Sequence, residues 1–208
     1  MSVAAALLAP LRPNADNTQV LETQAYQAIL GRGHGPIIPR LEEILAKPDP
    51  ALGYNIGGLR FYLGWAQEVS GDHAAAQESW RQARTELEPL LREQPDNYLL
   101  SSALALVDLG LGDKTAALKL AEAGMEGNPM EKDALIGPRA LEIFARVAAG
   151  IGQSDRAVEA IQKLLSIPYS GLIERQLPLT PSLLRLDPMF DPLRNDPRFQ
   201  KLCQGKQP

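Results

Sequence analysis

Residues 63–76 read LGWAQEVSGDHAAA, and the same order of residue types returns in LALVDLGLGDKTAA (104–117) and FARVAAGIGQSDRA (144–157). Each stretch is an apolar run, a glycine, a short polar stretch with an aspartate, and a small residue that opens a second apolar run. The glycines in ninth place are separated by 112 − 71 = 41 and 152 − 112 = 40 residues. A period of this length, made of two helices and a turn, predicts an α-solenoid whose hairpins bury their apolar faces by stacking.

This period divides the chain into an N-terminal flank (1–16), a repeat region (17–170) and a C-terminal capping segment with its tail (171–208). The predicted hairpins cover about 17–50, 55–95, 98–129 and 133–168. The first hairpin is the least regular, with helices around Thr18 to Leu30 and Pro39 to Ala46 and a looser copy of the turn at Gly33. We therefore expect an all-α protein, a right-handed α-solenoid of about four helix-turn-helix repeats with a C-terminal helical cap.

The apolar residues of the second hairpin advance by threes and fours, which places one apolar stripe on each helix. The stripes are Leu59, Tyr62, Leu63 and Ala66, followed by Ala76, Trp80, Ala83 and Leu87. Pro89 interrupts the second stripe. A proline inside a helix removes a hydrogen bond and clashes with the preceding turn, so we expect a kink or a restart there.

Composition supports an all-α protein and disfavours several other classes. The chain is 45% hydrophobic but only 5% aromatic, and its formal charge is −4 with acidic and basic residues interspersed. No basic stripe of the kind that binds phosphate backbones is present in the sequence, so nucleic acid is not an expected partner. The apolar start at 3–9 lacks a basic flank and is too short to span a bilayer, so we expect no membrane insertion. The expected location is the cytoplasm, or the periplasm if the chain belongs to a longer membrane-anchored protein.

The residue pattern over about 55–168 resembles the tetratricopeptide repeat family. Its marks are a large then a small residue in the first helix, glycine at the turn, alanine early in the second helix and proline at the exit. The matching positions are Leu63, Gly64, Gly71, Ala76, Trp80 and Ala83; Leu104, Ala105, Gly112, Ala117, Ala121, Gly124 and Pro129; and Phe144, Ala145, Gly152, Ala157 and Ile161. The family unit has about 34 residues, so the helices or connections here are longer. The resemblance implies an interaction scaffold that binds a peptide or a partner protein.

The C-terminal segment predicts a series of short helices. Four capping side chains each precede a proline, in Thr180-Pro181, Asp187-Pro188, Asp191-Pro192 and Asp196-Pro197, which is the arrangement that starts a helix. Its apolar residues, Leu183, Leu184, Leu186, Met189, Phe190, Leu193, Phe199 and Leu202, can cover the last hairpin. The stretch also resembles the endings of bacterial tetratricopeptide arrays attached to Ser/Thr-kinase, cyclase-like or transcription-regulator modules, which implies a role in bacterial signalling.

Catalytic chemistry is not expected from the sequence. His34 and His73 fall in predicted turns, outside any metal-ligand or nucleophile motif, and Cys203 is the single cysteine. The glycine-rich turn 31–35 lacks both a preceding strand and the lysine-serine or lysine-threonine pair of a phosphate loop. We therefore predict no catalytic residues, no metal and no cofactor.

The candidate binding surface follows from the geometry of the resembling family, in which first helices line a concave face. Residues beside the packing stripes are expected to point into this groove: Phe61, Trp65, Glu68, Ser102, Leu106, Arg139, Glu142 and Arg146. Phe61 and Trp65 could instead pack on the first hairpin or on the N-terminal flank. The two arginines are expected outside the stripe of Leu141, Phe144, Ala145 and Ala148, so reversing their charges should not change the melting temperature. The leading function is protein binding; self-association as a homodimer and a small-ligand sensor are the alternatives.

Overall fold

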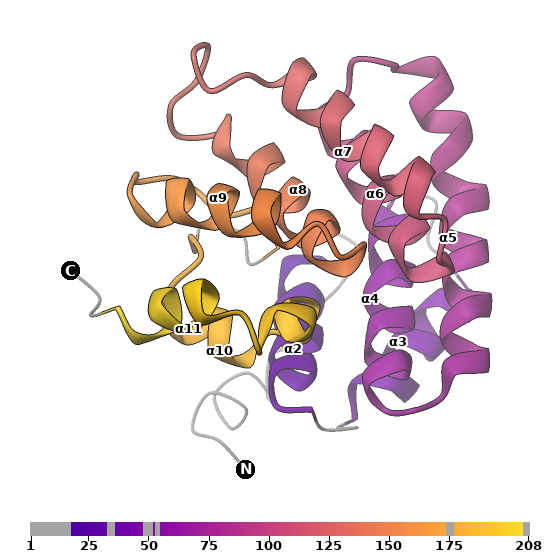
Figure 1. The fold of residues 1–208 in the computed structure, drawn as a ribbon. Helices are drawn as coiled ribbons and strands as arrows, with labels where there is room; N and C mark the ends of the chain where they lie inside the picture. The colour runs from indigo at the N-terminus through magenta and orange to yellow at the C-terminus, as the bar shows by residue number, and fades with distance from the viewer. Residues whose placement is uncertain (1–17, 33–35, 48–51, 53–54, 174–176, 206–208) are drawn as a thin grey trace. The chain divides into compact units, whose positions relative to one another are not determined.

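The computed structural model describes residues 18–32, 36–47, 52, 55–173 and 177–205. The predicted flank 1–16, the glycine at 33 and the histidine at 34 lie outside these residues. The described part is all-α, as predicted, and no strand occurs in it. Its helices are α2 (Thr18–Leu30), α3 (Ile37–Ala46), α4 (Asn55–Val69), α5 (His73–Glu93), α6 (Tyr98–Leu111), α7 (Lys114–Gly127), α8 (Pro138–Gly150), α9 (Ser154–Leu165), α10 (Pro181–Leu186), the 3₁₀ helix η2 (Pro188–Leu193) and α11 (Pro197–Gln204) (Figure 1).

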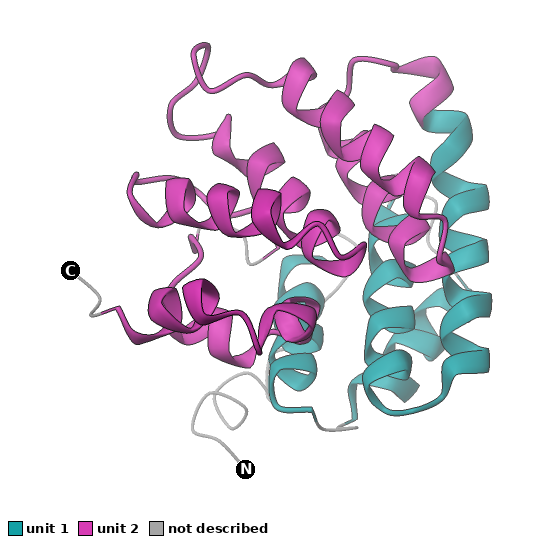
Figure 2. Cartoon of the chain, viewed as in Figure 1, with its two compact units in different colours: residues 1–90 teal, residues 91–208 magenta. Residues whose placement is uncertain are grey.

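These helices form two compact units, residues 1–90 and 91–208, and the boundary falls within α5 (Figure 2). The pairs α4–α5, α6–α7 and α8–α9 fall within the predicted hairpins 55–95, 98–129 and 133–168. None of the described helices is both long enough and apolar enough to cross a bilayer.

The three repeat glycines have the same backbone conformation. Gly71, Gly112 and Gly152 have φ values of +86°, +82° and +86°, in the left-handed region. The following residue in each turn donates its N–H to a carbonyl five positions back, in the pairs Asp72–Gln67, Asp113–Asp108 and Gln153–Ala148. A Cβ at these glycines would meet nothing within 4 Å, so the backbone angle, rather than lack of space, favours glycine there. The sequence repeat is thus a repeat of one helix-ending turn.

A second set of glycines serves close helix packing. A Cβ on Gly64 of α4 would lie 2.6 Å from Nε1 of Trp80 on α5, and one on Gly150 of α8 would lie 2.9 Å from the Leu109 side chain on α6. Trp80 fills the space over Gly64 and donates its indole N–H to the carbonyl of Phe61 at 3.3 Å. All eight stripe residues predicted for this hairpin are buried. Large side chains therefore pack where small residues leave room.

The predicted restart at Pro89 is wrong, because α5 continues through it to Glu93. Proline removes the bond that would reach the carbonyl of Thr85, four positions earlier. Thr85 and Pro89 are both exposed, so water can satisfy that carbonyl and the helix can continue.

Helix α8 lies at the centre of the second unit. It contacts α6, α7, α9 and η2, whereas α7 contacts α6 and α8. Residues on several sides of α8 are consequently buried, including Ala140, Ile143, Val147 and Ala149 in addition to most of the predicted stripe. The candidate site lies on α8, and the helices that contact α8 determine which of its side chains are buried.

We expect Ala117→Leu to destabilise the protein although it adds apolar surface. Ala117 on α7 is 0% exposed, and an oversized side chain at a close helix contact costs about 1–3 kcal/mol. Ala123→Leu is the matched control, because Ala123 lies on the same helix and is exposed. Urea denaturation should give a lower midpoint for the first variant alone. Equal midpoints for both variants would show that Ala117 is not at a close contact.

Candidate functional site: helix α8 and the C-terminal segment

The structure buries most of the residues predicted to line an open groove. Glu68 and Arg139 are partly exposed, whereas the other six are buried: Phe61, Trp65, Ser102, Leu106, Glu142 and Arg146. The exposure predicted for Ser102, Leu106, Glu142 and Arg146 is wrong, because their helices pack on more than one side. Their contacts show what each residue does instead.

Phe61 and Trp65 pack inside the first unit, which is the alternative considered from the sequence. The Trp65 ring lies 5.7 Å from the ring of Tyr26 on α2 and 5.6 Å from that of Phe61. Tyr62 completes this aromatic cluster, 6.3 Å from Trp65. These rings join α2 to α4.

Glu68 is the accessible candidate of the first unit. Its carboxylate lies 2.9 Å from Nδ1 of His73, and the two side chains are 40% and 70% exposed. The hydrogen bond and charge of Glu68 raise the pKa of His73. The stabilisation from this pair is therefore present when the histidine is protonated and is lost as the pH rises through the histidine's pKa. His73 begins α5 and is a surface residue with a local partner.

Ser102 and Leu106 lie on α6, which contacts both α7 and α8. Ser102 is only 1% exposed, and its hydroxyl has no hydrogen-bond partner among the described residues. Its oxygen would lie 3.3 Å from a Cβ added at Gly124, so the hydroxyl points into the α6–α7 contact.

We expect Ser102→Ala to leave the free energy of unfolding unchanged or slightly higher. Burying a hydroxyl without a partner costs about 1–3 kcal/mol, which offsets the packing lost with the oxygen. Ser79→Ala is the control, because the buried Ser79 hydroxyl donates to Gln67 at 2.7 Å. Removing that bond should lower stability by about 1 kcal/mol. Chemical denaturation measures the free energy of unfolding of both variants. A clear decrease of this free energy in Ser102→Ala would reveal a hydrogen bond to the Ser102 hydroxyl.

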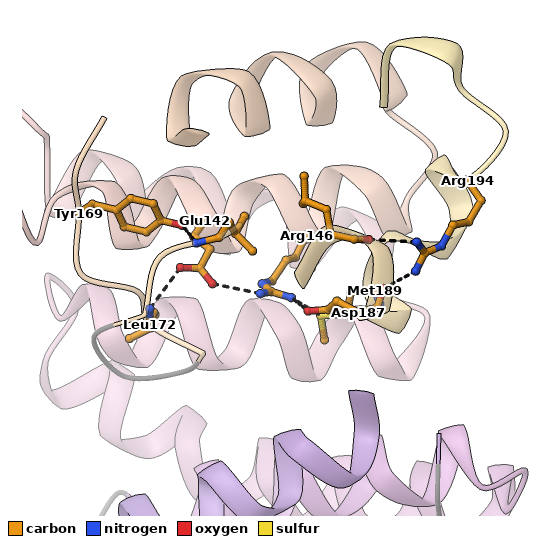
Figure 3. Close-up of polar contacts among 9 residues, drawn as sticks. Glu142, Arg146, Tyr169, Leu172, Asp187, Met189 and Arg194 are labelled. Atoms are coloured by element: carbon orange, nitrogen blue, oxygen red, sulfur yellow. Dashed lines mark hydrogen bonds and ion pairs between the residues drawn. The ribbon is translucent and has the colours of Figure 1, made fainter. Parts of the chain in front are cut away.

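Arg146 forms the centre of a buried ionic network (Figure 3). Its side chain is 1% exposed, and its guanidinium pairs with Glu142 one turn earlier at 3.1 Å and with Asp187 before η2. The guanidinium also lies over the Phe190 ring, 5.1 Å from its centre, and Nη1 approaches the sulfur of Met189 at 4.0 Å. One cation thus contacts two carboxylates and an aromatic face, joining α8 to the C-terminal segment.

Neighbouring side chains of α8 hold the backbone of the segment that follows α9. The second carboxylate oxygen of Glu142 accepts the Leu172 N–H at 3.2 Å. One turn earlier, Arg139 donates to the carbonyl of Ser170 at 3.1 Å and to its hydroxyl at 2.7 Å. Arg139, Glu142 and Arg146, spaced three and four apart, therefore act on one face of α8. This face binds a polypeptide, and the polypeptide belongs to the same chain.

Tyr169 strengthens the same region. Its hydroxyl accepts the Leu179 N–H at 2.8 Å, linking two parts of the segment (Figure 3). Burial is the main cause that raises the pKa of Tyr169, and the nearby charge of Glu142 adds to it. The tyrosine is therefore a neutral acceptor for the backbone at physiological pH.

The C-terminal helices begin largely where the capping pattern predicted. Thr180 accepts from the Leu183 N–H at 3.2 Å, Asp187 from the Met189 N–H at 2.9 Å and Asp196 from the Arg198 N–H at 2.8 Å. The predicted start at Asp191 is wrong, because Pro192 lies inside η2. The Asp191 carboxylate instead accepts from Arg194 at 3.0 Å.

The sequence did not predict Asp187 as a site residue, because a role in capping a helix explained an aspartate at this position. One carboxylate oxygen caps η2 while the other pairs with Arg146, and the side chain is 0% exposed. Arg146 was misassigned because a Glu–Arg pair four residues apart is ordinary on an exposed helix face. The run Val147, Ala148, Ala149 beside it was the available signal, because apolar residues beyond one stripe indicate a helix buried on several sides.

Comparison with known proteins adds no identity: no protein-family model, curated protein or solved structure matches the chain. Among the described residues there is no group of three or more His, Cys, Asp or Glu side chains arranged to hold a metal ion.

Proposed function

We propose that the chain is a protein-interaction module that binds a peptide or a segment of a partner protein. The observation that carries this proposal is the way α8 holds the chain's own polypeptide. Glu142 accepts the backbone N–H of Leu172, and Arg139 donates to the backbone carbonyl of Ser170. Arg146 forms an ion pair with the Asp187 carboxylate. Backbone contacts supply affinity for any extended segment, while a guanidinium–carboxylate pair supplies specificity.

The helical repeats support the same proposal. Three copies of one glycine turn, each with a positive φ, join α4 to α5, α6 to α7 and α8 to α9. Recurring helix-turn-helix units of this kind are the building blocks of α-helical repeat proteins. Assignment to the tetratricopeptide family, a stacked solenoid with a concave binding groove and a place in bacterial signalling belong to this proposal and rest on the sequence resemblance. Self-association is the second candidate of the sequence reading.

The test is direct binding by the full-length chain. Proteins captured from the source organism would be purified, and their binding measured by calorimetry with wild type, Glu68→Lys and Glu126→Lys. Glu68 is the accessible groove candidate near the end of α4, where a lysine suits the helix dipole, and Glu126 is an exposed control on α7. A polypeptide that binds wild type and the control with defined stoichiometry supports the proposal. A stoichiometric small molecule without any polypeptide ligand, seen by native mass spectrometry, would contradict it.

Loss of binding in Glu68→Lys alone would place the partner on the α4 side of the first unit. Equal binding by all three chains would leave α8 as the face to test next. Mass measured over a wide range of concentration tests self-association separately.

A further inference from the structure

The C-terminal segment 180–204 is held together by its own contacts. Phe190 and Phe199 have ring centres 6.0 Å apart, joining η2 to α11. Arg194 donates to the carbonyls of Leu184 and Asp187 at 3.0 and 3.2 Å, and Arg185 donates to that of Cys203. These bonds connect α10, η2 and α11 to one another, so the segment is one locally bonded unit in the structure.

The attachment of this segment to the hairpin α8–α9 uses ionic contacts at two places. One is the buried set around Arg146, where Asp187 and Phe190 approach the guanidinium. The other is an exposed pair between Arg198 and Asp155 at 2.8 Å, with side chains 51% and 89% exposed, which contributes little. The buried ionic contact between α8 and the segment therefore lies at Arg146, and Leu184, Phe190 and Leu193 of the segment, each 0% exposed, add apolar burial.

A buried ion pair contributes more to selectivity than to stability. Desolvating both ions offsets most of their attraction, but a ligand without the carboxylate would leave the buried guanidinium paired with Glu142 and without the carboxylate of Asp187. We therefore expect this face of α8 to favour an acidic segment, with an aromatic residue over the guanidinium, over an apolar one. Asp187 and Phe190, three residues apart across a single 3₁₀ turn, meet both requirements.

We propose that the α8 face around Arg146 is a recognition surface for a partner segment carrying an aspartate and, three residues later, an aromatic residue. The chain's own Asp187–Phe190 turn occupies this surface and competes with the partner. The inference rests on the proposed function and gives the chemistry of its ligand. Since only the fraction of molecules with a released segment can bind, the affinity for the partner is lowered by that fraction.

The probe is a fluorescent peptide of residues 179–204, and the readout is anisotropy with the full-length chain. Asp187→Asn in the chain retains size and capping but removes the charge that pairs with Arg146, so the internal segment competes less. We expect this variant to bind the native peptide about tenfold more tightly than wild type does. The same peptide carrying Asp187→Asn should bind the Asp187→Asn chain with about tenfold lower affinity than the native peptide does.

Asp196→Asn in the chain is the matched control. Asp196 caps α11 and pairs with Arg198 within the segment, so its change should not alter binding of the peptide. Equal weak binding by all chains, or equal binding of both peptides, would overturn the proposal. A wild-type dimer that Asp187→Asn does not form would also overturn it, since the occupant would then be a second copy.

Hydrogen exchange on the wild type tests the proposal even if Asp187→Asn fails to fold. Release of the segment as a unit predicts that amides of 182–204 exchange at least about tenfold faster than those of α8. Exchange of both at the same rate would show a segment that opens only on global unfolding and would overturn the proposal. Neither measurement uses an outside partner, so failure here is distinct from failure to find a protein ligand.

Discussion

We expect Arg146→Ala to lower the free energy of unfolding by about 3–5 kcal/mol, the usual result of breaking a buried ion pair by removing one partner. The variant leaves the carboxylates of Glu142 and Asp187 close together in a site where Arg146 is 1% exposed. It also removes the cation from the Phe190 ring. Equilibrium denaturation followed by circular dichroism measures the change.

Arg156→Ala is the matched control for this prediction. Arg156 also pairs with a carboxylate, that of Glu122 at 2.7 Å, and also lies over an aromatic ring, that of Phe144 at 4.6 Å. Its side chain is 44% exposed, so its loss should cost about 1 kcal/mol or less. Similar small losses for both variants would mean that water reaches Arg146 in solution. This prediction replaces the sequence-based expectation that charge reversal at 139 and 146 leaves stability unchanged.

Truncation after Ser170 should cause aggregation or a sharp fall in melting temperature. The truncation removes Leu184, Phe190 and Leu193, each 0% exposed, and takes Asp187 away from Arg146. Burial of each such apolar side chain contributes about 1.5–3 kcal/mol, and repeat proteins lose solubility without a terminal cap. The sum is large beside the ~5–15 kcal/mol of a typical domain.

Thermal unfolding and light scattering of the truncated and full-length chains measure this effect. Leu186→Ser is a control within the removed segment, because Leu186 is 50% exposed and should tolerate a polar residue. A soluble truncation with an unchanged melting temperature would show that residues 177–202 are a tethered binding motif and not a cap.

Local features could be predicted because their causes lie within a few residues. A glycine after a helix adopts the left-handed angle that other residues disfavour, so the turns at Gly71, Gly112 and Gly152 were visible in the sequence. The same is true of the caps at Thr180 and Asp196, whose side chains bond to backbone N–H groups two or three residues away.

The tertiary structure alone decided which charged residues are buried. Arg146 and Asp187 are 41 residues apart in the chain, and neither the helical period nor the capping pattern relates them. Periodicity distinguishes one face of a helix from the other, but the number of neighbours that surround the helix decides whether the polar face meets water. Helix α8 contacts α6, α7, α9 and η2, so a Glu–Arg pair typical of a solvated surface lies in the interior. The sequence by itself thus determined the helices, their turns and their small-residue contacts, while packing around α8 determined where the candidate site lies.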